Sequence, residues 1–286
     1  MTVEPALPLP STTTMPGRIA FVGAGPGQAD LITLRGAQRL AQAAVVLTDA
    51  LVDPALRDLA PRARWLAVGK RGFADSTGQS AINTLLIQCA HEVGSGGLVV
   101  RLKGGDPSLF GRLEEELQAM ADAGIDCEVV PGVTAALAAA ASAQRPLTRR
   151  GSGRSVSFAT AMTRTSADAT AAPADSGADT HIDRVQASRS ADTEVFYMAG
   201  KQLCALAGKL VRAGWASQTE VCVSSRAGWP DERRSDHTID TLDRASLLHA
   251  GRPTVVVVGA GARPLHAASP SADGDIPASS MAALNT

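Results

Sequence analysis

Short apolar runs alternate with segments of helical periodicity through the first half of this chain. Continuous apolar runs, as a fully buried strand requires, occur at residues 18–22, 45–47, 63–68, 99–102 and 127–130. Between them apolar residues recur every three or four positions, which predicts helices at residues 30–43, 51–59, 80–93 and 112–123. Strands that alternate with helices are typical of a parallel sheet, so the pattern predicts an α/β fold.

A second series of elements follows the Pro131–Gly132 break, which we interpret as a domain boundary. Its pattern predicts helices at 134–143 and 203–213, and strands at 156–160, 194–198, 221–224 and 254–258. The predicted domains therefore cover residues 17–131 and 132–263. Residues 163–193 are rich in Ala, Asp, Ser and Thr and poor in large apolar side chains, which predicts a disordered insertion. Residues 1–16 and 264–286 are predicted to be disordered tails.

One stretch, VVRLKGGDPSLFGRLEEE at residues 99–116, combines a buried strand with a glycine turn and a charged helix. Two consecutive glycines, Gly104 and Gly105, let the backbone approach a ligand and adopt positive φ. Open α/β sheets bind ligands outside the carboxyl ends of their strands, which is where this turn lies. A simple tight turn would use the same residues, so the stretch alone leaves both interpretations open.

Composition narrows the class of protein. The formal net charge of the 286 residues is −1, which gives no reason to expect a nucleic-acid or membrane partner. The four cysteines form no C-x-x-C pair, so we expect free thiols and no metal. The N-terminus lacks the basic start and apolar run of a signal peptide, and no apolar run reaches the length of about 18 residues that a membrane helix needs. We therefore expect a cytoplasmic protein.

The loop after the first strand, GAGPG, nearly matches a dinucleotide-binding fingerprint. The third glycine of that motif would fall at position 28, which is Gln28, and Pro26 interrupts the passage into the helix. Asp49 does follow the second strand, as a ribose-binding acid would. The motif is incomplete, and it argues against a dehydrogenase.

Several stretches together resemble the tetrapyrrole methylase family and, within it, the uroporphyrinogen-III C-methyltransferases. They are VGAGPGQADLITLRGAQRL, TDALVD, VGKR, VVRLKGGDPSLFGR, EVVPGVTAALAAAASAQRPLTRRG and FYMAG, in the family's order and near its spacing. The resemblance implies two α/β domains with S-adenosylmethionine in the cleft between them, and a homodimer. It implies methyl transfer to C2 and C7 of uroporphyrinogen III, which gives precorrin-2 for sirohaem and cobalamin synthesis.

The resemblance also assigns roles to residues. Those at the family's cofactor-binding positions are Pro26, Gly104, Gly105, Asp106, Leu109, Thr134, Ala135, Met198 and Ala227. Those predicted to act in catalysis are Arg112, Asp49, Lys70 and Glu115, with Glu115 one turn beyond Arg112 and able to orient it. Because the acceptor carries eight carboxylates, we expect arginines to bind it, and the candidates are Arg150, Arg149, Arg35 and Arg71.

Some positions depart from the family's pattern. Gln28, Thr48, Arg149 and Leu113 replace a common Asp, Tyr, His and Gly, and SRAGWPDERRS at residues 225–235 lacks the usual Thr-x-x-Gln ending. Two alternatives therefore stay open beside the C2/C7 methyltransferase. One is a methyltransferase acting later on the precorrin route. The other is a non-catalytic module that binds S-adenosylmethionine or a tetrapyrrole.

Overall fold

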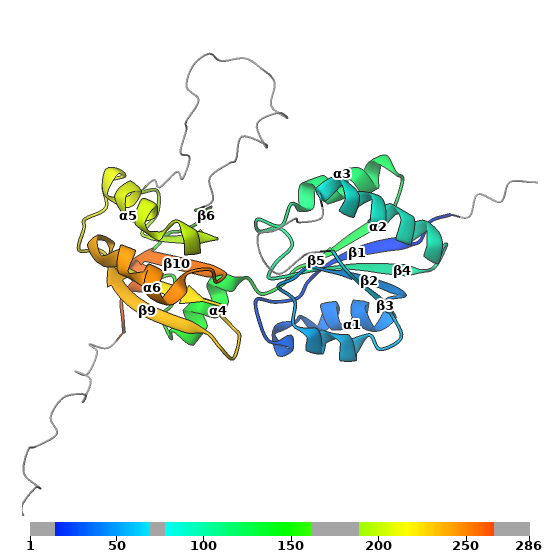
Figure 1. The fold of residues 1–286 in the computed structure, drawn as a ribbon, viewed down its shortest axis with the longest axis horizontal. Helices are drawn as coiled ribbons and strands as arrows, with labels where there is room; N and C mark the ends of the chain where they lie inside the picture. The colour runs from blue at the N-terminus through cyan, green and yellow to red at the C-terminus, as the bar shows by residue number, and fades with distance from the viewer. Residues whose placement is uncertain (1–14, 69–77, 162–188, 266–286) are drawn as a thin grey trace, which may run out of the picture.

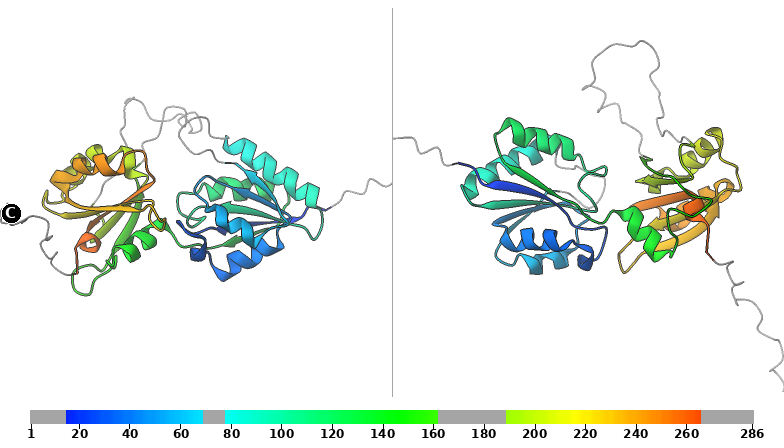
Figure 2. Two further views of the ribbon diagram at one scale, coloured as in Figure 1. Left: turned by 60° about the horizontal axis from the view of Figure 1, so that its bottom comes forward. Right: turned by 180° about the vertical axis from the view of Figure 1, so that it is seen from behind.

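The computed structural model describes residues 15–68, 78–161 and 189–265. Two five-stranded sheets lie side by side, one in the N-terminal half (residues 15–131) and one in the C-terminal half (residues 132–265) (Figures 1 and 2). The chain passes from the first to the second between strand β5 and helix α4, directly after Pro131–Gly132. The predicted mixed α/β fold is therefore confirmed.

The sheet of the N-terminal half is entirely parallel, with the strand order β3-β2-β4-β1-β5. Its strands are β1 (Arg18–Gly23), β2 (Val45–Thr48), β3 (Arg64–Ala67), β4 (Leu98–Lys103) and β5 (Cys127–Val130). All residues of β2 and β4 are buried. Burial on both faces explains why these strands form continuous apolar runs in the sequence.

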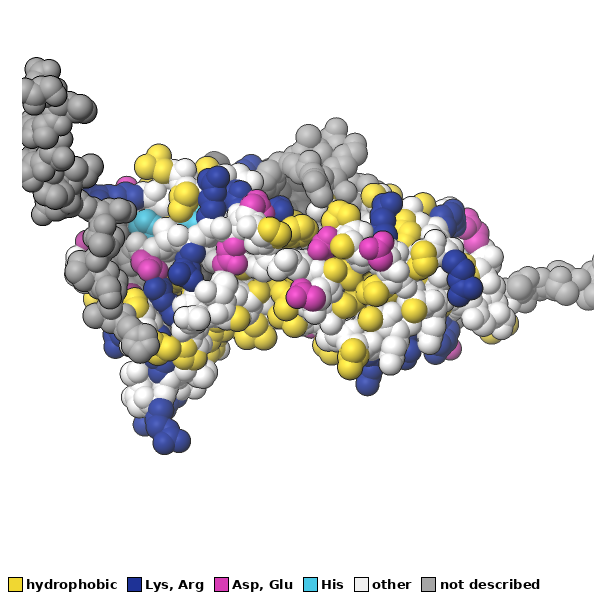
Figure 3. Space-filling view, turned by 90° about the horizontal axis from the view of Figure 1, so that it is seen from below, with side chains coloured by type: hydrophobic (Ala, Val, Ile, Leu, Met, Phe, Trp, Pro, Cys, Tyr) yellow, Lys and Arg dark blue, Asp and Glu magenta, His cyan; other side chains and the backbone are white. Residues whose placement is uncertain are grey.

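Helices cover both faces of this sheet (Figure 1). Ile19 and Phe21 of β1 pack with α2 (Gln79–Val93) and α3 (Leu113–Asp122), while Ala20 and Val22 pack with α1 (Leu34–Gln42) on the other face. This division follows the alternation of side chains along a strand. Figure 3 shows the face that carries α1, where apolar side chains are spread over the surface between charged ones.

Two predicted helices of the N-terminal half are shorter than expected. The helix expected at 30–43 is a 3-10 turn, Ala29–Leu31, followed by α1, because the Thr33 hydroxyl accepts the Gly36 N–H at 3.1 Å and starts α1 there. The helix expected at 51–59 is a 3-10 helix, Pro54–Leu59. Asp53 caps its first turn by accepting the Ala55 N–H at 2.9 Å.

The sheet of the C-terminal half is mixed, with the order β6-β7-β10-β8-β9, and only β6 and β7 run parallel. Its strands are β6 (Val156–Thr160), β7 (Thr193–Tyr197), β8 (Glu220–Ser225), β9 (Arg233–Thr238) and β10 (Thr254–Gly259). Its helices are α4 (Ala135–Ser142), α5 (Leu203–Arg212) and α6 (Ser246–His249), with 3-10 turns at Ala199–Lys201, Ile239–Ala245 and Ala260–Ala262. Helix α4 packs on one face, and α5 with the Ile239–Ala245 turn packs on the other.

Strand β9 is absent from the elements predicted above. Its sequence, RRSDHT, is polar throughout and none of its residues is buried. It lies at the edge of the sheet and pairs antiparallel with β8 alone. An edge strand that faces solvent needs no apolar residues, so hydrophobic patterning does not reveal it.

The predicted insertion and tails fall mostly outside the described residues. Within the insertion, residues 189–192 are described and lead into β7, and the Asp192 carboxylate accepts the backbone N–H groups of Arg154 and Ser155 at 2.8 and 3.1 Å. The end of the predicted insertion is thus part of the folded structure, which corrects the boundary at 193. Among the described residues, no helix is both long and apolar enough to cross a bilayer.

Candidate functional site

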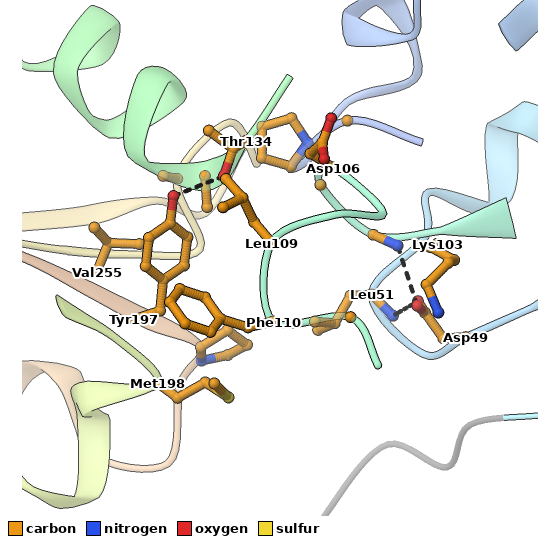
Figure 4. A pocket seen from close by; sticks show the side chains of 18 of the residues that line it. Asp49, Leu51, Lys103, Asp106, Leu109, Phe110, Thr134, Tyr197, Met198 and Val255 are labelled. Atoms are coloured by element: carbon orange, nitrogen blue, oxygen red, sulfur yellow. Dashed lines mark hydrogen bonds between the residues drawn. The ribbon is translucent and has the colours of Figure 1, made fainter. Parts of the chain in front are cut away.

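A cavity of about 360 Å³ opens between the two halves. The N-terminal half lines it with Gly25, Pro26, Asp49, Leu51, Gln79, Arg101, Lys103, Gly104, Gly105, Asp106, Leu109, Phe110, Gly111 and Arg112. The C-terminal half lines it with Thr134, Ala135, Tyr197, Met198, Arg226, Ala227, Trp229, Pro253, Thr254 and Val255. Figure 4 shows side chains from both groups around this cavity, which we call the pocket. Its volume lies at the lower end of the roughly 300–1,000 Å³ typical of small-molecule sites.

The N-terminal wall of the pocket is formed where three neighbouring parallel strands end. Asp49 follows β2, Gly104 follows β4 and Gly25 lies just after β1, so the strand order brings them to one edge of the sheet. The Asp49 carboxylate accepts the backbone N–H groups of Leu51 and Gly104 at 3.0 and 3.1 Å (Figure 4). Gly105 and Gly25 exchange backbone hydrogen bonds of 2.7 and 3.3 Å. The strand ends are therefore held together by backbone contacts.

Gly105 presents bare backbone to the pocket. Its φ is +72°, and a Cβ added there would meet no atom within 4 Å. That combination of left-handed backbone and open space at the carboxyl end of a strand suits a ligand that approaches the main chain closely. The glycine turn predicted from the sequence thus lies in a pocket wall.

Asp106 joins this wall to the passage between the halves. One oxygen of its carboxylate accepts the Ser108 N–H at 2.8 Å, and the other accepts the Gly132 N–H at 2.9 Å. Gly132 itself lies so close to the wall that a Cβ on it would stand 2.3 Å from the Gly105 carbonyl oxygen. The Pro131–Gly132 break is therefore required by a close approach of two backbone segments.

A buried ionic network forms part of the N-terminal wall, where Arg101 and Lys103 also line the pocket. Arg101 and Lys103 of β4 both contact the Glu116 carboxylate of α3, with Nε–Oε1 and Nζ–Oε2 distances of 3.0 and 2.5 Å. All three residues are at least 95% buried. Burial and the neighbouring Arg101 charge lower the pKa of Lys103 from its ordinary value. This buried network of two cations and one carboxylate holds α3 against β4.

Arg112 and Glu115 pair at the rim of the pocket. The Arg112 guanidinium donates through Nε and Nη2 to the two Glu115 oxygens at 2.6 and 2.7 Å. This hydrogen bond lowers the pKa of the Glu115 carboxyl. Arg112 has a left-handed backbone, with φ of +54°, and α3 begins at the next residue, Leu113. The structure therefore contains the expected i,i+3 pair, and both side chains remain more than 45% exposed.

The C-terminal wall is built from larger side chains. The Tyr197 hydroxyl and the Thr134 hydroxyl are 2.7 Å apart, and the Phe110 and Tyr197 ring centroids are 5.1 Å apart (Figure 4). Burial raises the pKa of Tyr197. Phe110 belongs to the N-terminal half, so this ring contact joins the two walls and makes this side of the pocket aromatic.

A tight turn at residues 226–229 completes the C-terminal wall. The Trp229 N–H donates to the Arg226 carbonyl oxygen at 3.0 Å, and the Arg226 N–H donates to the Pro253 carbonyl oxygen at 2.8 Å. The Gly228 carbonyl oxygen accepts the Gln28 N–H of the other half at 2.9 Å. Here the two halves touch directly, beside the GAGPG loop.

Unusual backbone conformations concentrate at this site. Five non-glycine residues of the described chain have positive φ, and four of them line the pocket: Phe110, Arg112, Met198 and Arg226. Such conformations are costly for residues with a side chain and persist where the surroundings hold them. Their clustering indicates a pocket whose shape is maintained at the expense of backbone strain.

The structure brings most of the predicted site residues together. All nine predicted cofactor-binding residues line the pocket: Pro26, Gly104, Gly105, Asp106, Leu109, Thr134, Ala135, Met198 and Ala227. Asp49 and Arg112 line it as well, and Glu115 is paired to Arg112 behind the rim. Lys70 lies outside the described residues. The roles of these residues stay predictions.

The three predicted acceptor-binding arginines that the structure describes, Arg35, Arg149 and Arg150, do not line the pocket. Arg35 is exposed on α1, and Arg150 is exposed beyond α4. The Arg149 side chain donates through Nη2 to the Arg263 carbonyl oxygen, and its Nε is buried without a partner among the described residues. Arg71 lies outside the described residues. A role for these arginines in binding the acceptor stays a prediction.

Sequence reasoning missed several residues of the pocket, namely Leu51, Gln79, Arg101, Lys103, Phe110, Tyr197, Arg226 and Trp229. Two signals were present. The alternation of Arg101 and Lys103 inside an otherwise apolar strand marks a buried charge on one face of the sheet. Tyr197, the single tyrosine of the chain, stands next to Met198. No group of His, Cys, Asp or Glu side chains within residues 15–68, 78–161 and 189–265 is arranged to hold a metal ion.

Comparison with known proteins agrees with this architecture. The model of the tetrapyrrole (corrin/porphyrin) methylases matches residues 18–243. The siroheme synthase of Sodalis glossinidius is 41% identical over 244 residues, which are 85% of this chain and 48% of that protein. The chain thus spans about half the length of the curated relatives it matches.

Solved structures share the fold. Uroporphyrin-III C-methyl transferase from Thermus thermophilus, complexed with S-adenyl homocysteine, has a TM-score of 0.67 and 30% identity, with 85% of this chain and 97% of that chain covered. A cobalt precorrin-4 methyltransferase has a TM-score of 0.69 and 26% identity, with 86% and 96% covered. The family match, the identity and the fold lead to one conclusion: the chain belongs to the tetrapyrrole methylases.

Proposed function

We propose that the protein transfers methyl groups from S-adenosylmethionine to C2 and C7 of uroporphyrinogen III, forming precorrin-2. The observation that carries the proposal is that one pocket collects all nine predicted cofactor-binding residues together with Asp49 and Arg112. The Thermus thermophilus neighbour, a uroporphyrin-III C-methyl transferase complexed with S-adenyl homocysteine, supports both the acceptor and the donor. The siroheme synthase relatives support a place in sirohaem synthesis.

The residues present fit the proposed donor. The pocket of about 360 Å³ suits one small molecule rather than a whole tetrapyrrole. The bare backbone of Gly105 leaves room along the N-terminal wall, and the aromatic C-terminal wall suits the apolar face of a nucleoside. The acceptor would then meet the donor at the open side of the pocket.

S-adenosylmethionine supplies a methyl group on a sulfonium, and the thioether left after transfer is neutral, so the chain's main contribution is alignment. The Gly104–Gly105 backbone and Asp106 hold the donor's side of the pocket in a fixed position. In this proposal Asp49, whose carboxylate is held by two backbone N–H groups, accepts a proton as the methylated ring returns to neutrality. Arg112, oriented by Glu115, stabilises negative charge on the acceptor, because a guanidinium group is a poor base.

The test is an anaerobic assay of purified protein with methyl-labelled S-adenosylmethionine and uroporphyrinogen III. We expect a product that carries two labelled methyl groups. The Asp49→Asn variant keeps the shape of the side chain but replaces one accepting oxygen with a donating NH2, opposite the Leu51 or the Gly104 N–H. It should lose turnover, and S-adenosylhomocysteine affinity measured beside it separates loss of the base from a shift of the Gly104 backbone. If the wild-type protein binds S-adenosylmethionine but transfers no methyl group, the proposal is contradicted and the non-catalytic module is favoured.

A later precorrin methyltransferase is the second candidate. The cobalt precorrin-4 methyltransferase has a TM-score of 0.69, as high as that of the uroporphyrin-III enzyme, although its identity is lower. Turnover of precorrin-4 together with inactivity toward uroporphyrinogen III would decide for this candidate. A homodimer and a cytoplasmic location stay predictions, the first open to light scattering of the purified protein.

A further inference from the structure

Trp229 is a large aromatic residue with no role in the protein core. The described chain has three tryptophans, and the other two pack in cores: Trp215 is buried in the cluster around α5, and Trp65 packs against the cluster around α1. Trp229 is in none of the four core clusters. It lines the pocket and is only partly buried. Packing in the core clusters therefore does not account for a tryptophan at this position.

The indole N–H of Trp229 is also available. The corresponding groups of Trp65 and Trp215 donate to the Ala60 carbonyl oxygen and the Glu194 carboxylate, at 3.1 and 3.3 Å. The Trp229 Nε1–H donates to no atom of the described residues, and it is not enclosed. An indole N–H that is not used inside the protein can donate to a ligand.

One face of the ring is covered by a charged side chain. The Arg226 guanidinium lies over it, with Cζ 4.3 Å from the ring centroid. Arg226 donates through Nε to the Asp231 carboxylate at 2.7 Å, and Arg252 contacts the same carboxylate at 3.2 Å. The guanidinium thus supports one face of the indole, as in a cation–π pair.

The turn that carries the ring is fixed from several sides. The Gly228 N–H donates to the Glu232 carboxylate at 3.1 Å, and the Gly228 carbonyl oxygen accepts the Gln28 N–H of the other half. Arg226 keeps a left-handed φ of +54° within this turn. A strained, multiply anchored turn that presents a flat ring to a pocket is typical of a preorganised binding surface.

We propose that Trp229, supported by Arg226, is a stacking platform for the flat purine ring of the methyl donor. The inference rests on the proposed function, since it takes S-adenosylmethionine as the donor. The platform lies where the two halves touch, beside Pro26, and on the opposite half from Asp49. This arrangement places the purine at the joined side of the pocket and leaves Asp49 and Arg112 for the acceptor. Trp229 and Arg226 belong to SRAGWPDERRS, the segment that departs from the family pattern.

The test compares ligand binding by the full-length protein and two variants, using calorimetry and tryptophan fluorescence with S-adenosylhomocysteine and with adenosine. Base–aromatic stacking is strong enough that Trp229→Ala should weaken both ligands by about tenfold or more. Trp229→Phe keeps a ring and should retain most of the affinity. The ligand-induced change in fluorescence should vanish in Trp229→Phe and persist in Trp65→Phe, whose ring also lies under an arginine, Arg57, but outside the pocket.

The outcomes separate the two proposals. If the wild-type protein binds no S-adenosylhomocysteine, the proposed function fails and the platform fails with it. If the wild type binds and Trp229→Ala binds equally well, the platform alone is overturned. Unchanged donor affinity with a raised KM for uroporphyrinogen III would also overturn it, because the ring would then contact the acceptor. An unchanged melting temperature of Trp229→Ala excludes loss of folding as the cause of weaker binding.

Discussion

The two walls of the pocket rest on buried polar networks of different kinds. In the N-terminal wall the network is ionic, with Glu116 between Arg101 and Lys103. Behind the C-terminal wall it is a chain of histidines and serines. His249 contacts the Ser225 hydroxyl through Nδ1 at 2.9 Å and the Ser235 hydroxyl through Nε2 at 2.8 Å.

The difference follows from what each network can satisfy. A buried cation must have a partner charge, so the N-terminal network depends on a full ion pair. Neutral imidazole both donates and accepts, so His249 is satisfied by two hydroxyls without a partner charge. The Arg252 guanidinium joins this network by donating through Nε to the Ser225 hydroxyl at 3.0 Å. Burial, with His237, Arg252 and Arg233 nearby, lowers the pKa of His249 to about 4, and the ring is therefore neutral near pH 7. We expect the stability of the N-terminal wall to depend on the Glu116 charge, and the stability of the C-terminal wall to fall in acid.

The largest effect should come from Glu116→Ala. The variant leaves Arg101 and Lys103 buried without their carboxylate, and we expect the free energy of unfolding to fall by about 3–5 kcal/mol. Denaturant unfolding of the purified protein measures this. Glu115→Ala is the matched control, because its pair with Arg112 is half exposed and should contribute less than about 1 kcal/mol. Equal losses in the two variants would show that the buried network has no special weight.

The second effect is a loss of stability at low pH. Because the pKa of His249 is lower in the folded protein than its ordinary 6.5, the unfolded chain binds the extra proton first as the pH falls. The contribution of neutral His249 is fully present above about pH 6.5 and is lost as the pH approaches about 4, by on the order of 3 kcal/mol.

Unfolding curves between pH 4 and 7 measure this loss. His249→Gln should flatten the dependence, and His91→Gln on the exposed side of α2 should leave it unchanged. A profile that His249→Gln does not alter would assign the acid response to other groups.

The smallest of the three effects is local to the ligand. Gly105→Val should lower S-adenosylhomocysteine affinity by about tenfold or more, because the added side chain projects into the open space of the N-terminal wall. Gly124→Val is the matched control: Gly124 also has positive φ, +66°, and open space around it, but it lies outside the pocket. Both variants should lose about 1–2 kcal/mol of stability from backbone strain. Equal ligand affinity in the two would mean that the donor does not contact Gly105.

Much of the fold could be predicted from local patterns. Strand β5 and strand β6 have the predicted bounds, and the predicted strand at 99–102 gains one residue at each end as β4. These strands are recognisable because burial on one or both faces demands apolar residues at fixed periods. Strand β9 could not be recognised in the sequence, because an exposed edge strand does not require apolar residues and RRSDHT has none.

The candidate site, like the fold, could be predicted from the sequence only in part. The chain alone determined where the Gly104–Gly105 turn and the Pro131–Gly132 break lie. The structure gives the reason for glycine there: Gly105 has a left-handed φ, and a Cβ would be obstructed at Gly104 and Gly132. The chain also determined the family, through several motifs in series. It did not reveal that Glu116, fifteen residues after Arg101, would be the partner of both buried cations.

Only the tertiary structure decided which side chains face one another across the pocket. The strand order β2-β4-β1 brings Asp49, Gly104 and Gly25 to one edge, and the contact of Gln28 with Gly228 sets the turn of Trp229 against them. These residues are up to about two hundred positions apart in the sequence. Their proximity depends on the strand order within the first sheet and on how the two halves pack, and local periodicity encodes neither.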